Sequence, residues 1–414
     1  MAGLKDVKVR TASGESTLED SSPSDVPPPP PGPPPGDKPS ASPKWLAVVG
    51  AVLALGTFIL VGGTVQLANP AFGIWFTELV VFFGLGWVML RHTGWRPAVY
   101  TGLLPAPKGA TLLGFLLGVA NFFAVVVPIQ FLAQSVAPEW LTRMFDSSRL
   151  FADQTPLELA LILTGVSVAA PVCEEFFFRG IFQRGITPPA PAPSTVPLVV
   201  SAVVFSAFHL DPVGFLARTE LGLLFGWLFL RTGSLWPGIG AHAANNLVSS
   251  VLFLSAKALG AESTDASSEA TDPRLVLVLA AVGWAGLSAL LSYARRNPAV
   301  WGPGTLAIDE EARAPGPRPS LARLLLPWVV GATASLGLLV AVDSRGLALN
   351  FYDAQHPLPT LEDPAPPAQQ AERKALSALR AAARRGELPM EAYYEERERQ
   401  IRVHPLQTGP GLKP

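Results

Sequence analysis

Three short stretches place polar side chains that can do chemistry inside long apolar sequence. They are APVCEEFFFRG, FSAFH and GAHAANN, and their polar residues include Glu174, Glu175, Arg179, His209, His242, Asn245 and Asn246. An ionisable group at the depth of a bilayer costs about 3 kcal/mol or more, so each of these groups needs a partner or a function. Because the groups occur together, they can serve as partners for one another.

The spacing of these residues indicates which side chains share a helix face. Glu175 and Arg179 are four residues apart, so they either form a structural ion pair at a helix end or brace a site. Glu174 projects about 100° away from its neighbour and remains available for other work. His242 and Asn246 are also four residues apart, so the imidazole and the amide point into one volume.

Together these groups match what amide hydrolysis by water requires. A carboxylate in an apolar site, such as Glu174, is a competent general base for water. One neutral histidine can orient that water, and a second histidine with an amide can supply donors to the oxyanion of a tetrahedral intermediate. The pattern therefore predicts glutamate-dependent hydrolysis without a covalent acyl-enzyme.

Other hydrolytic chemistries lack their motifs. The GxSG of a rhomboid-like serine protease is absent, since GVSV at Ser167 and GLSA at Ser288 lack the second glycine. Neither the zincin HExxH motif nor a presenilin-like pair of aspartates is found in the spans. Cys173, the only cysteine, lies beside two carboxylates that disfavour a thiolate, so we interpret it as an apolar filler.

The rest of the chain must hold these groups inside a membrane. Of 414 residues, 49% are hydrophobic, and mean hydropathy is +0.34 with a net charge of −1. Charges concentrate in residues 1–44 and 343–414, which leaves the middle of the chain sparsely charged. This distribution disfavours a soluble multidomain protein, a disordered chain and a nucleic-acid binder. It predicts an integral multi-pass protein whose partners are the lipid bilayer and a peptide or protein substrate.

Nine apolar runs predict an all-α polytopic transmembrane helical bundle of about 8–9 helices with a buried polar active site. They lie at 45–68, 72–90, 110–134, 156–178, 195–210, 212–230, 234–255, 275–293 and 322–342. Only helices and closed barrels satisfy the backbone in lipid, and most of these runs are too long for barrel strands. We expect a transmembrane domain at 45–342 with a catalytic core at 156–255. A disordered Pro/Ser-rich tail at 1–44 and a soluble tail at 343–414 would flank it.

The run at 195–210 is too short for an ordinary span and creates a geometric difficulty. As a full crossing it would carry His209 to the outer surface, away from Glu174. A short, deeply set helix after a proline-rich loop at 186–198 would let both residues meet in a water-filled cavity. Other acidic and basic residues near the predicted helix ends are expected to snorkel and to be structural; they are Glu78, Glu158, Arg218 and Glu220.

Charges in the loops orient the predicted bundle. Basic residues follow even-numbered spans, whereas 257–274 is acidic, so the amino terminus is expected in the cytoplasm. Nine spans would put the carboxyl tail outside. Within that tail, residues 370–400 resemble the small helical hairpins of the SHOCT type, which are usually cytoplasmic. We interpret this segment as a solvated helix pair without chemistry of its own.

The three polar stretches resemble motifs of the CPBP family of intramembrane proteases. EEFFFRG is similar to its EExxxR motif, FSAFH to FxxxH and HAANN to HxxxN, in the same order, within about residues 156–255. This family includes type II CAAX prenyl endopeptidases and bacteriocin-processing proteases of the ABI type. The resemblance implies the following catalytic residues: Glu174 as general base, His209 positioning the water, and His242 with Asn246 stabilising the oxyanion. Glu175 and Arg179 would support them.

Two alternatives remain open at this point. The family is often labelled a metalloprotease, and Glu174, His209 and His242 could form a zinc site. We favour no metal, because Asn246 would be idle in the zinc version. For function, the leading expectation is an intramembrane endopeptidase acting on a membrane-associated, possibly CAAX-prenylated-type substrate. The alternative is a non-enzymatic partner-binding or immunity protein that retains the fold, and a transporter would require internal repeats that the sequence lacks.

Overall fold

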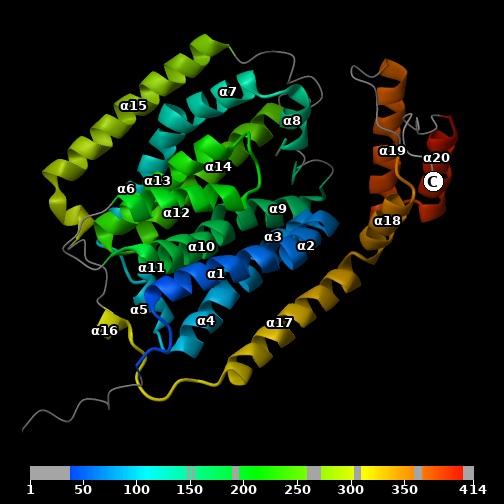
Figure 1. The fold of residues 1–414 in the computed structure, drawn as a ribbon. Coiled ribbons are helices and arrows are strands. Elements are labelled where there is room, and N and C mark those ends of the chain that lie inside the picture. The colour runs from blue at the N-terminus through cyan, green and yellow to red at the C-terminus, as the bar shows by residue number, and fades with distance from the viewer. Residues whose placement is uncertain are drawn as a thin grey trace, which may run out of the picture. The chain divides into compact units, whose positions relative to one another are not determined.

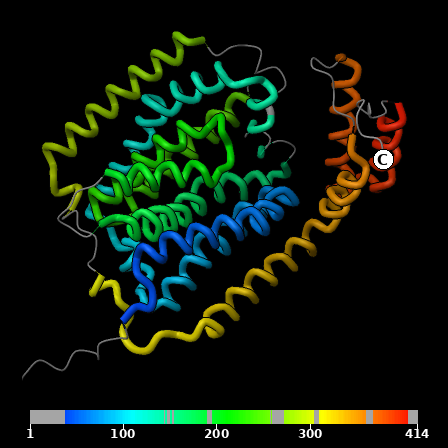
Figure 2. The backbone as a smooth tube through the Cα atoms, viewed as in Figure 1, coloured from blue at the N-terminus to red at the C-terminus, as the bar shows by residue number. Residues whose placement is uncertain are grey.

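The computed structural model describes residues 38–146, 150–151, 154–188, 195–258, 272–302, 309–358 and 366–403. In these ranges the chain is helical, and the one β-type pairing is an isolated bridge between Trp95 and Arg313. Figures 1 and 2 show helices that lie side by side in a bundle. The predicted all-α polytopic architecture is therefore confirmed.

Six helices in the described ranges are long and apolar enough to cross a membrane. They are Pro43–Ala68, Pro70–Thr93, Ala110–Val136, Pro156–Ile186, Pro273–Arg296 and Leu321–Val342. Four of them begin with proline, which suits the first helical turn because the missing N–H has no intrahelical partner there. The helices have 22 to 31 residues, more than the ~20 that a bilayer core requires.

Short π-helical turns divide four of these spans into named elements. The first span comprises α1 (Pro43–Thr57), η1 (Phe58–Gly62) and α2 (Gly63–Ala68), and the second α3 (Pro70–Phe76), η2 (Thr77–Leu85) and α4 (Gly86–Thr93). The third comprises α6 (Ala110–Asn121), η3 (Phe122–Val126) and α7 (Val127–Val136). The fourth comprises α9 (Pro156–Thr164), η5 (Gly165–Ala169), α10 (Ala170–Glu175), η6 (Phe176–Gln183) and α11 (Arg184–Ile186). The remaining long spans, α15 (Pro273–Arg296) and α17 (Leu321–Val342), are uninterrupted.

Three further helices lie between the fourth span and α15. They are α12 (Val196–Phe208), α13 (Phe215–Thr232) and α14 (Trp236–Ala258). Short elements connect the spans elsewhere: α5 (Pro97–Thr101), α8 (Glu139–Met144), η7 (Pro298–Trp301) and α16 (Asp309–Ala312). Each of the nine predicted apolar runs thus corresponds to a described helical segment.

The helices α12 and α13 form a hairpin. With 13 residues, α12 is about 20 Å long, too short for a ~30 Å hydrocarbon core. The backbones approach closely, since a Cβ on Gly222 of α13 would lie 2.7 Å from Cα of Ala202 on α12. The short helix is therefore present as predicted, while the number of membrane crossings stays a prediction. Part of the predicted loop 186–198 lies outside the described residues, and α12 already begins at Val196.

Glycines bring α14 against α6 and so fix the helix that carries His242. A Cβ on Gly114 would lie 2.1 Å from the Pro237 carbonyl oxygen, and one on Gly118 would lie 2.4 Å from that of Ala241. No real side chain tolerates such distances, so glycine at both positions permits this helix contact. Because Ala241 precedes His242, the depth and rotation of the imidazole depend on the contact.

The carboxyl-terminal helices form a small cluster with an apolar core of its own. They are α18 (Ser344–Gln355), α19 (Pro367–Arg385) and α20 (Met390–Val403), and Leu349, Leu376, Ala383 and Tyr393 form their core. Gly386, at φ +78°, ends α19 in the left-handed conformation that favours glycine. The helix pair predicted at 370–400 falls on α19 and α20. Most of the predicted amino-terminal tail, residues 1–37, lies outside the described residues.

A buried polar network joins this cluster to the transmembrane helices. Asp343, 8% exposed, accepts hydrogen bonds from Asn69 at 2.8 Å and from Arg384 at 2.7 and 3.0 Å. Arg384 also pairs with Glu158 at 2.7 Å, in the first turn of α9. Glu158 therefore does not snorkel as expected, because it pairs with a residue of the tail.

We expect Asp343→Ala to loosen the carboxyl-terminal helices from the bundle. The change leaves Asn69 and Arg384 without their acceptor, which costs about 2–3 kcal/mol when a charged, buried hydrogen bond is lost. Limited proteolysis of the detergent-purified protein should then release α19–α20 roughly 30- to 150-fold faster, because each 1.4 kcal/mol is a factor of ten in the opening equilibrium. Arg402→Ala, which removes an exposed ion pair with Glu398, serves as the control and should leave the rate unchanged. Equal rates for both variants would contradict the proposed anchoring.

Candidate active site

The two adjacent glutamates lie where an α-helical segment changes to a π-helical one. Glu174 and Glu175 are the last residues of α10, and η6 follows directly with Phe176–Gln183. A π-turn inserts an extra residue and rotates the following side chains, and such turns are frequent at functional sites. Both glutamates are buried, Glu174 at 8% exposure and Glu175 at 0%.

Glu175 and Arg179 form an ion pair that water does not reach. The Arg179 Nη1 donates to Glu175 Oε1 at 2.9 Å. The arginine side chain is 0% exposed and the glutamate side chain 1%. A second guanidinium nitrogen donates to the Gly222 carbonyl of α13 at 3.2 Å. The guanidinium also lies 4.4 Å from the centre of the Phe205 ring of α12, a favourable cation–π contact. This pair therefore connects the fourth span to both arms of the hairpin.

His242 is held between the two glutamates. Its Nδ1 lies 3.1 Å from Glu175 Oε1, and its Nε2 lies 3.8 Å from Glu174 Oε2. An ionised carboxylate only accepts hydrogen bonds, so the contact with Glu175 assigns a proton to Nδ1. The Nε2 is thereby directed toward Glu174. The Phe225 ring stacks on the imidazole at 4.8 Å and limits its rotation.

Glu174, the general base expected from the sequence, has one carboxylate oxygen that is available for a hydrogen bond. Glu174 Oε2 is buried and has no hydrogen-bond partner among the described residues. It lies beyond hydrogen-bond distance of His242, a separation that a bridging water can span. This oxygen therefore has hydrogen-bonding capacity that the described side chains do not use.

His209 lies at the turn of the hairpin, and both His209 and His242 contact the Phe205 ring. His209 follows α12 and is exposed, and its Nδ1 lies 3.0 Å from the Phe205 carbonyl oxygen. The Phe205 ring centre is 5.0 Å from the His209 ring and 5.8 Å from the His242 ring. The two histidines thus face a common region from different helices. No direct contact between His209 and Glu174 is present in the described structure.

The two asparagines turn toward a different part of the fourth span. Asn246 donates to the Val166 carbonyl of η5 at 2.8 Å, and Asn245 donates to the Asn246 side chain at 3.1 Å. The Asn246 amide is therefore anchored by one N–H and accepts one bond at its oxygen. A second N–H remains for a substrate, so its predicted oxyanion role stays a prediction.

A third buried carboxyl group at the site was missed in the sequence. Glu78 lies in η2, is 4% exposed, and has an oxygen without a hydrogen-bond partner in the described ranges. The segment η2 packs against α10, which carries Cys173 and Glu174. The expectation that Glu78 snorkels was wrong, because the helix continues about 12 Å beyond it toward Pro70. Glu78 is the one acidic residue in the apolar run 72–90, and this sequence signal could have identified it as a candidate site residue.

Two other residues expected to snorkel also have partners. Arg218 pairs with Asp211 at 2.7 Å across the turn of the hairpin, beside His209. Glu220 accepts a hydrogen bond from Asn121 of α6 at 2.8 Å. Both residues thus stabilise contacts between helices, and Arg218 contributes positive charge close to the site.

The alternative zinc site is not assembled in this geometry. Among the described residues, no group of three His, Cys, Asp or Glu side chains lies close enough to hold a metal ion. In particular, His242 directs one nitrogen to Glu175, and His209 lies apart from Glu174. We therefore derive no step through a metal, and metal dependence is tested by experiment below.

Comparison with known proteins relates the core of this bundle to one protein family. Residues 156–248 match the family model described as type II CAAX prenyl endopeptidase Rce1-like. No significant match was found among curated proteins or solved structures. The matched segment contains all six residues predicted for the site. This part of an integral membrane protein is therefore similar to a CAAX prenyl endopeptidase domain, and the match confirms the resemblance seen in the sequence.

The buried ion pair predicts a specific pattern of stability changes. Glu175→Gln or Arg179→Met should each lower the free energy of unfolding by about 3–5 kcal/mol, because each leaves a buried charge unpaired. The double variant should lose less than the sum of the two. Thermal unfolding in detergent measures this cycle, with Arg385→Ala as a control for an exposed pair. Fully additive losses would show that the pairing itself contributes nothing.

Proposed function

We propose that this protein is an intramembrane endopeptidase that uses Glu174 to activate water. The observation that carries the proposal is the buried, unpartnered Oε2 of Glu174 opposite His242, whose ring is oriented by the Glu175–Arg179 pair. A pre-oriented acceptor in a water-poor site supports general-base catalysis. The substrate class at family level is a membrane-associated peptide or protein of the CAAX type.

In the proposed reaction, Glu174 Oε2 takes a proton from a water molecule. The water oxygen forms a bond to the carbonyl carbon of the scissile peptide, and the carbonyl oxygen becomes an oxyanion. The second N–H of Asn246 and a protonated His242 Nε2 would donate to that oxyanion, while His209 orients the water. The C–N bond then breaks, and Glu174 returns its proton to the leaving amine. Glu175 holds the imidazole in this orientation through its contact with Nδ1.

We include Glu78 in this proposal as a positioning residue. Two carboxylates close together in a site with little water repel strongly when both are ionised. Glu78 and Glu174 would therefore share one proton, which ties the ionisation of the general base to its neighbour. Glu78 comes from the second span, so this residue would add a contribution from outside the matched domain.

The orientation in the membrane is also a proposal. Basic residues gather at the end of the bundle where α1 begins, and they include Arg91, Arg96, Lys108, Arg295 and Arg296. The positive-inside tendency favours this end for the cytoplasm. α17 then places the carboxyl-terminal helices on the opposite side.

Glu174→Gln should abolish cleavage with little change in the amount of folded protein. General bases contribute about 10²–10⁴ in rate, so kcat/KM should fall by that factor. The assay uses lipid-reconstituted protein and a peptide library that includes prenylated CAAX peptides. Glu391→Gln, an exposed glutamate of α20, is the matched control.

The same assay tests metal dependence and the non-enzymatic alternative. We expect a strong chelator to leave wild-type cleavage unchanged; loss on chelation with recovery on zinc addition would contradict the metal-free mechanism. A protein that merely binds a partner predicts a different outcome: no cleavage by wild type, and a cellular phenotype that survives Glu174→Gln.

Glu78→Gln should shift the pH dependence of kcat/KM. Removing one of two carboxyl groups that share a proton changes the protonation of the site, so the acidic limb should move. Glu220→Gln, a partly buried acid bonded to Asn121, is the control and should leave the profile in place. An unshifted profile for Glu78→Gln would exclude a shared proton.

A further inference from the structure

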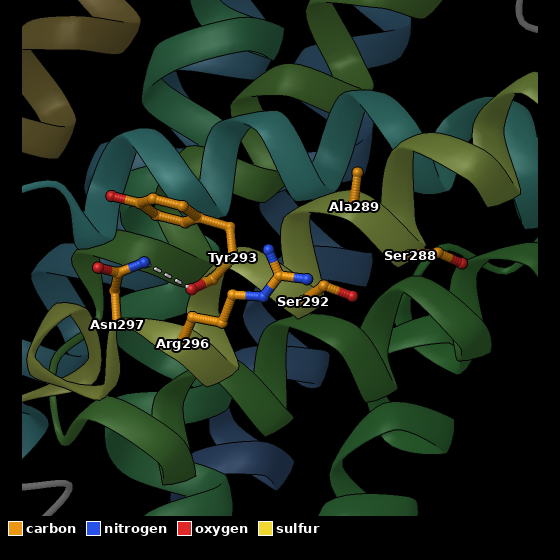
Figure 3. A pocket seen from close by; sticks show the side chains of 6 residues that line it. All are labelled: Ser288, Ala289, Ser292, Tyr293, Arg296 and Asn297. Carbon is orange, nitrogen blue, oxygen red and sulfur yellow. Dashed lines mark hydrogen bonds between the residues drawn. The ribbon is translucent and has the colours of Figure 1, made fainter.

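Two adjoining cavities lie along α15 near its carboxyl end. One, of about 560 Å³, is lined by α15 alone and includes Tyr293, Arg296 and Asn297 (Figure 3). The other, of about 510 Å³, lies between α6 and α15 and shares Tyr293 and Asn297 with the first. They therefore form a continuous groove, which we call the α6–α15 groove.

The α6–α15 groove is apolar at one end and basic at the other. Leu112 and Leu116 of α6 line its apolar part and are 62% and 40% exposed. Lys108, before α6, lines the cavity between α6 and α15, and Arg296, at the end of α15, lines the adjoining one. Both cations are exposed, and neither forms an ion pair or side-chain hydrogen bond with another described residue. The charge at this end of the groove is thus not neutralised by the protein.

The position of the groove fits the boundary between hydrocarbon and headgroups. α6 begins at Ala110 and α15 ends at Arg296, so the basic end lies where two spans leave the membrane. Tyr293 is 54% exposed, and tyrosine is enriched at this interface. The exposed leucines then lie one to two turns deeper, at the level of acyl chains.

We propose that the α6–α15 groove binds an anionic glycerophospholipid. Its phosphate group would contact Lys108, Arg296 and the Asn297 amide, and an acyl chain would lie along Leu112 and Leu116. Charge complementarity selects an anionic headgroup over a zwitterionic one, because the groove offers two cations and no acid in its lining. The inference concerns a site separate from Glu174 and does not depend on the proposed proteolysis.

The groove nevertheless lies on a helix that contacts the catalytic region. The opposite face of α6 packs against α14 through Gly114 and Gly118, immediately beside His242. A lipid that bridges α6 and α15 would hold α6 in this position. Delipidation should therefore lower thermal stability, and added anionic lipid should restore it.

Native mass spectrometry of the full-length protein in detergent tests the proposal. Phosphatidylglycerol and phosphatidylcholine with identical acyl chains are titrated, with glycerol phosphate as a headgroup without chains. We expect phosphatidylglycerol to bind at least tenfold more tightly than phosphatidylcholine, since each interfacial cation contributes about a fivefold electrostatic preference. Glycerol phosphate should compete poorly. Equal binding of both lipids, or equal competition by glycerol phosphate, would overturn a phospholipid site.

Matched variants locate the bound lipid. The double variant Lys108→Gln, Arg296→Gln should reduce the preference for phosphatidylglycerol about tenfold or more. Arg323→Gln changes an exposed cation in the first turn of α17, outside the groove, and should have no effect. Leu112→Trp obstructs the apolar part while leaving both cations, and should also weaken binding. All four positions are exposed, so folding is expected to survive; an unchanged preference in the double variant would refute the proposal.

Discussion

The arrangement of helices at the centre of the bundle depends on the Arg179 guanidinium, a charged group that is buried away from water. An unpaired charge at such a position costs several kcal/mol, so every neighbour must contribute. Glu175 neutralises the cation, the Gly222 carbonyl accepts a second N–H, and the Phe205 ring covers it. These partners belong to α10, α13 and α12. The contacts of this one cation therefore fix three helices relative to one another. Electrostatic interactions as well as packing thus hold the hairpin at the site.

The carboxylate that neutralises Arg179 also orients the site. Glu175 Oε1 accepts from the guanidinium and lies within hydrogen-bond distance of His242. The two interpretations left open by the sequence, a structural ion pair and a support for the site, are therefore one arrangement. The side chain that determines the direction of His242 is itself completely buried. Glu175 thus orients the imidazole through its Nδ1, and the Nε2 remains available to Glu174.

Sequence patterns predicted most of what depends on local periodicity. Apolar runs gave the helices, and spacings of four residues gave the Glu175–Arg179 pair, because both follow from helix geometry. What the sequence did not indicate depends on contacts between distant segments. The η2 segment of Glu78 packs against α10, about a hundred residues further along the chain, Glu158 pairs with Arg384 across more than two hundred residues, and Asn246 donates to Val166. Likewise, the hairpin of α12 and α13 requires knowledge of backbone packing at Gly222, which no periodicity encodes.

The network around Asp343 determines when the charges of the fourth span acquire their partners during synthesis. Asn69 and Glu158 enter the membrane well before their partners, Asp343 and Arg384, are translated. The start of the helix that leads to Glu174 therefore keeps a carboxylate without its cation until α19 has been synthesised. The carboxyl-terminal helices thus complete the electrostatics of the fourth span.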